Sequence, residues 1–98
     1  METNVTGPEQ GGKTPVQIVD AFQAYLDERI GEIAEDDWLL LDDFHGHCDA
    51  VRREWEHAER VSVANPDVRR GLLKRCATNL AKAERAFALL LNAWISRR

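Results

Sequence analysis

Two long helical patterns constrain the fold of this chain more than any other feature. Core-type side chains recur at alternating steps of three and four in two segments. This spacing gathers side chains into one stripe along an α-helix and is typical of coiled-coil packing. The first stripe comprises Leu41, Phe44, Cys48, Val51, Trp55, Ala58 and Ser62, and the second comprises Leu73, Cys76, Leu80, Ala83, Phe87, Leu90 and Trp94. Only a short segment around Asn65-Pro66 separates them, which predicts an antiparallel helical hairpin over about 38–62 and 66–97.

A further helix is predicted before the hairpin, over about 15–34. Thr14 and Gln17 have the spacing of a capping box, and Pro15 fits the first helical position because no N–H is needed there. The apolar residues that follow are again spaced by three and four: Ile18, Phe22, Tyr25, Leu26, Ile30 and Ile33. No alternating β-branched run or hairpin turn signal is present, so the predicted fold is all-α, with three helices.

The length of 98 residues predicts a single domain. Residues 1–13 are polar, contain Gly and Pro and lack an apolar period, so we expect a disordered N-terminal tail followed by one all-α domain over 14–98. No apolar run approaches the roughly 20 residues that span a bilayer, and the N-terminus lacks a signal-peptide layout. We therefore expect a cytoplasmic protein without a membrane partner, in which both cysteines are thiols.

The charge of the chain is divided between its two parts. Residues 1–64 hold fifteen acids and five Lys or Arg, whereas residues 65–98 hold two acids and eight Lys or Arg. We interpret this division as ion pairs across the hairpin, such as Glu59 with Arg69 and Glu54 with Lys74. The net charge of −4 and the lack of an RNA-binding signature favour no nucleic-acid partner.

One polar stripe beside the first seam carries possible metal ligands. Asp43 and His47 are four residues apart, and Glu54 and His57 form a Glu-x-x-His pair, which is half of the ligand set of di-iron helical bundles. The alternative function is therefore a dimeric helical metal-binding protein or hydrolase, completed by carboxylates of a neighbouring helix or subunit. The competing interpretation is a solvated helix face. We assign no catalytic residue, metal or cofactor, and an enzyme is the less favoured class.

The apolar excess lies at the open end of the predicted hairpin. Residues 38–41 and 86–95 are apolar nearly all the way round a helix, which is typical of a helix covered on every side. A chain this short has too few other residues to cover them, so we expect a protein partner or a homodimer, with a monomeric three-helix bundle as the alternative. The candidate contacts are Trp38, Leu39, Leu89, Leu91, Trp94 and Ile95. An acidic rim is predicted beside them: Glu35, Asp36, Asp37, Asp42 and Asp43. The predicted function is a helical interaction module, such as an adaptor, a regulatory or assembly subunit, or an acidic inhibitor.

Overall fold

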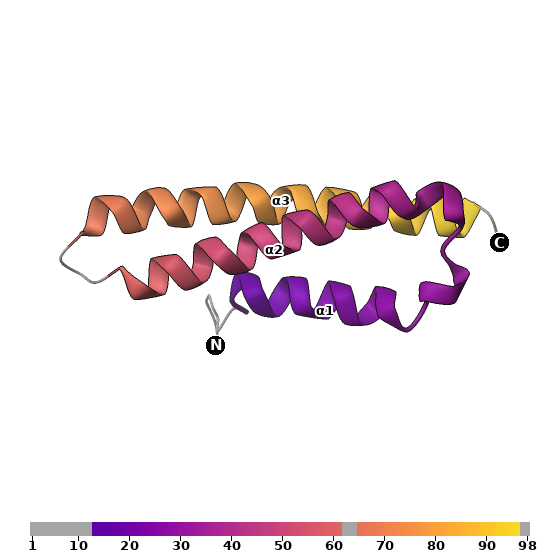
Figure 1. The fold of residues 1–98 in the computed structure, drawn as a ribbon, viewed down its shortest axis with the longest axis horizontal. Coiled ribbons are helices and arrows are strands. Elements are labelled where there is room, and N and C mark those ends of the chain that lie inside the picture. The colour runs from indigo at the N-terminus through magenta and orange to yellow at the C-terminus, as the bar shows by residue number, and fades with distance from the viewer. Residues whose placement is uncertain (1–12, 62–64, 97–98) are drawn as a thin grey trace, which may run out of the picture.

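The computed structural model describes residues 13–61 and 65–96. These residues form three helices, α1 (Pro15–Asp27), α2 (Trp38–Arg60) and α3 (Pro66–Ser96), and contain no strand. Figure 1 shows α2 and α3 side by side as an antiparallel pair, with α1 lying along part of α2. The predicted all-α fold and helical hairpin are confirmed. Most of the predicted tail and Ser62 of the first seam lie outside the described residues.

The helices start where the sequence supplies the signals. Thr14 Oγ1 accepts a hydrogen bond from the Gln17 backbone N–H at 3.2 Å, and Gln17 Oε1 accepts one from the Thr14 N–H at 2.8 Å. This is the predicted capping box, and Pro15 follows at the first helical position. At the start of α3, the Arg69 N–H donates to the Asn65 carbonyl at 3.1 Å. Asp37 takes the N-cap position of α2, although its side chain makes no capping hydrogen bond.

The predicted end of the first helix near Ala34 is wrong. α1 ends at Asp27, where the Arg29 N–H donates to the Leu26 carbonyl at 2.9 Å and tightens the last turn. Two short 3₁₀ turns, Ile30–Glu32 and Glu35–Asp37, then reverse the chain into α2. Apolar residues three apart suit a 3₁₀ turn as well as an α-helix, so the pattern did not reveal where the helix stops. Ile30 is exposed, whereas Ile33 still packs against the core.

The core lies mainly between α2 and α3. On α2, Trp55 of the predicted seam is half-buried. Five other residues of that seam are buried: Leu41, Phe44, Cys48, Val51 and Ala58. On α3, Cys76, Ala83 and Leu90 are buried as predicted. Leu72 is buried in place of Leu73, and Ala86 is buried in addition. The buried stripe of α3 is therefore wider than the predicted seam.

α1 is held to the hairpin by an aromatic stack and a polar network. The Phe22 ring stacks on Phe87 with a centroid separation of 4.4 Å and an interplanar angle of 13°. Arg52 donates to Asp20 and to Gln23, and the Gln23 Nε2 lies 2.8 Å from His45 Nδ1. α1 has 13 residues against 23 and 31 in α2 and α3, so it covers only part of one side of the hairpin. The loop end of the hairpin is a two-helix structure (Figure 1).

Candidate interaction surface

Large apolar side chains are exposed at the end of the hairpin where α2 begins and α3 ends, which we call the tip. Leu39 is 80% exposed, Ile95 58%, Trp38 54% and Leu89 47%. The other two predicted contacts, Leu91 and Trp94, are half-buried. Burial of an apolar side chain contributes about 25 cal/mol per Å² removed from water, so covering these side chains would be favourable.

The structure divides five of these six side chains between two sides of the tip. Trp94 lies on the α1 side, where its Nε1 donates to Glu32 Oε1 at 3.2 Å and the Arg29 guanidinium is 6.0 Å from its ring centroid. Leu91 lies about one turn before Trp94 on α3, and Trp38 lies two turns before His45, which contacts α1. Leu89 lies on the opposite side of the hairpin. Leu39 is one turn before Asp43, which lines the same hollow as Leu89.

That hollow lies between α2 and α3, next to the tip. It has a volume of about 180 Å³ and is lined by Leu40, Asp43, His47, Lys82, Arg85, Ala86 and Leu89. Its floor is apolar, its α2 wall carries a carboxylate and an imidazole, and its α3 wall carries two cations. Side chains of opposite sign therefore face each other across a small apolar depression. The sequence patterns identified Asp43, His47 and Leu89 but did not indicate that they share a hollow, because register across the hairpin is a tertiary property.

The residues of the predicted acidic rim lie at or next to the start of α2. Glu35, Asp36 and Asp37 form the second 3₁₀ turn, directly before α2. Asp42 and Asp43 lie in the second turn of α2 and are exposed. Carboxylates directly before a helix are favoured by its dipole, so the placement of Asp36 and Asp37 also stabilises α2.

No three of the four candidate metal ligands, Asp43, His47, Glu54 and His57, form one group in the described part of the chain. Glu54 Oε1 accepts a hydrogen bond from Asn79 Nδ2 at 2.6 Å, whereas His57 is exposed. Asp43 and His47 share the hollow with two cations rather than with further carboxylates. Within residues 13–61 and 65–96, no group of three or more His, Cys, Asp or Glu side chains is placed to hold a metal ion.

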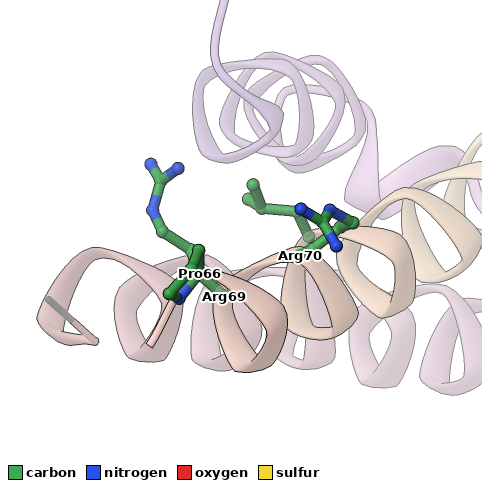
Figure 2. Close-up of a pocket in the computed structure, with 4 residues that line it drawn as sticks. Pro66, Arg69 and Arg70 are labelled. Atoms are coloured by element: carbon green, nitrogen blue, oxygen red, sulfur yellow. The ribbon is translucent and has the colours of Figure 1, made fainter. Parts of the chain in front are cut away.

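The predicted ion pairs across the hairpin are not formed between described residues. The pairs that the structure shows lie within a helix or between α1 and α2: Arg60 with Glu56, Arg70 with Asp67, and Arg52 with Asp49 and Asp20. At the loop end, Pro66, Arg69, Arg70 and Leu73 line a hollow of about 260 Å³. Figure 2 shows the guanidinium groups of Arg69 and Arg70 on the same side of α3. Pairs one turn apart need no register between helices, so local partners replace the predicted ladder.

Both cysteines are buried free thiols. Burial raises the pKa of Cys48 to about 11, an effect that nearby Arg52 partly offsets. Burial also raises the pKa of Cys76, and the Glu54 carboxylate adds to the increase. The Cys76 thiol donates to the Val51 carbonyl with a separation of 3.6 Å. Raised pKa values keep both thiols protonated near neutral pH, which suits core packing rather than nucleophilic chemistry.

The fold defines an all-α protein built on a long antiparallel hairpin that a shorter helix covers on one side. Comparison with protein-family models, curated proteins and solved structures found no match. None of the described helices combines the length and apolar character needed to cross a membrane.

Proposed function

We propose that this chain is a helical protein–protein interaction module that acts through the tip of its α2–α3 hairpin. The first interaction that we propose is between two copies of the chain. The observation that carries the proposal is the exposure of Trp38, Leu39, Leu89 and Ile95 at one end of the molecule. Covering a fully exposed Leu side chain contributes about 1.5–3 kcal/mol, so a few such residues supply the apolar part of an interface.

The acidic side chains beside the tip support an interaction that is guided by charge. The carboxylates of Glu35, Asp36 and Asp42 are exposed around the apolar residues. A charged rim around an apolar centre steers a surface of complementary charge toward it, and in a second copy of the chain α3 carries that charge. The cytoplasmic location expected from the sequence remains part of this proposal.

The test uses a substitution that the monomer tolerates. Leu39 projects into solvent, so Leu39→Glu costs the isolated fold little and removes apolar surface from the tip. Ala21→Glu adds the same charge at an exposed position in the middle of α1, away from the tip, and is the matched control. Light scattering at micromolar concentration should show a dimer for the parent and for Ala21→Glu, and a folded monomer for Leu39→Glu. A parent chain that is monomeric throughout the concentration range would contradict self-association.

A further inference from the structure

The side of the hairpin opposite α1 has no covering helix among the described residues. α1 approaches from the other side, where Phe22 meets Phe87 and Asp20 meets Arg52. The uncovered side carries the hollow whose apolar lining is formed by Leu40, Ala86 and Leu89. We call this side the open face.

The two helices that form the open face carry opposite net charge. α2 (Trp38–Arg60) contains six acids and three arginines, which gives −3. α3 (Pro66–Ser96) contains two acids and six Lys or Arg, which gives +4. A partner that places an acidic helix over α3 and a basic helix over α2 would complement this face along its length.

A second copy of the chain has these properties in one orientation. A two-fold rotation about an axis parallel to the hairpin packs α2 of each copy against α3 of the other. Two equivalent α2–α3 contacts result, because both copies use the same surface. The same rotation keeps the two tips together, so Leu39 and Leu89 of both copies meet. An end-to-end reversed dimer would place the apolar tip against the charged loop end instead, where it gains less burial.

We infer that the open face is the homodimer interface, with α2 packed against α3 of the partner copy and the two tips at the same end. The inference rests on the proposed self-association and assigns it a face and an orientation. The hollow next to the tip becomes an interface pocket, in which Asp43 of one copy faces the cationic wall of the other. The Trp38 side of the tip stays outside this interface.

A charge-swap experiment tests the inference. Asp43 and Arg85 both line the hollow, both are exposed, and they lie at nearly the same level of the hairpin. In the inferred dimer, Asp43→Lys alone places two cations together at each of two symmetric sites, and Arg85→Glu alone places two acids together. Each variant should dimerise about tenfold more weakly than the parent or worse. An equimolar mixture should recover the lost affinity. In the heterodimer, the introduced lysine faces the introduced glutamate at one site, and the native Asp43 faces the native Arg85 at the other.

The mixture separates contacts between copies from contacts within a chain. Mixing cannot repair a pair inside one copy, so recovery requires that these side chains face each other across the dimer. No recovery, with a parent that dimerises and a Leu39→Glu variant that does not, would overturn the orientation and leave the proposed function standing. A parent that never dimerises would overturn both.

Cross-linking supplies an independent reading of the orientation. Leu39→Cys marks the tip and Val68→Cys marks the loop end, and both positions are exposed, whereas Cys48 and Cys76 are buried. A short bismaleimide reagent should join Leu39→Cys to Leu39→Cys in a mixture of the two variants. A dominant adduct between Leu39→Cys and Val68→Cys would show the reversed dimer and contradict the inference.

Discussion

The attachment of α1 provides the sharpest test of which interaction stabilises this fold. α1 meets the hairpin through the Phe22–Phe87 stack and through the Asp20–Arg52 ion pair. We predict that Phe22→Ala destabilises the protein by about 2–3 kcal/mol. We predict that Asp20→Ala costs less than about 1 kcal/mol.

The magnitudes follow from burial. The Asp20 side chain is 57% exposed and that of Arg52 is 33% exposed, so solvent screens their attraction. Arg52 also keeps Gln23 and Asp49 as partners when Asp20 is removed. The Phe22 ring is half-buried and stacked, so its loss removes both apolar burial and an aromatic contact, although less than for a fully buried Phe.

Urea unfolding followed by far-ultraviolet circular dichroism measures both losses. Leu39→Glu is the background for both variants, because self-association would otherwise add a concentration-dependent stabilisation. Hydrogen exchange should show that Phe22→Ala exposes the amides of Pro15–Asp27 while those of the α2 and α3 core stay protected. The reasoning is refuted if Asp20→Ala destabilises the protein as much as Phe22→Ala does.

Two further predictions concern the hairpin itself. The folded-state pKa of Cys48, about 11, exceeds its ordinary value of 9.0, so the unfolded chain loses this proton first as pH rises. Stability should therefore be unaffected by this group below about pH 9 and fall by on the order of 2–3 kcal/mol as pH approaches the folded-state value, and Cys48→Ala should show a shallower pH dependence in urea midpoints. Gly46→Ala should raise the free energy of unfolding by about 0.5–1 kcal/mol, because Gly46 lies inside α2 and an added Cβ meets no atom within 4 Å. A lower thermal midpoint for Gly46→Ala would contradict that expectation.

The sequence alone was sufficient for the parts of the fold that depend on local chemistry. The capping box at Thr14 and Gln17 and the Asn65-Pro66 start set two helix boundaries, since these signals act within one turn. The three-four period set the helical class and most of the α2 seam, because it places side chains on one side of any helix that carries it.

The tertiary structure decided what depends on register and on how much of the hairpin α1 covers. It ended α1 at Asp27, after which two short 3₁₀ turns reverse the chain, and it buried Leu72 in place of Leu73. It also placed Leu89 with Asp43 around one hollow and Trp94 on the opposite side, beside Glu32. The spacing of apolar residues determines on which side of a single helix they lie. Only the packing of the three helices against one another determines which of those sides remain exposed to a partner.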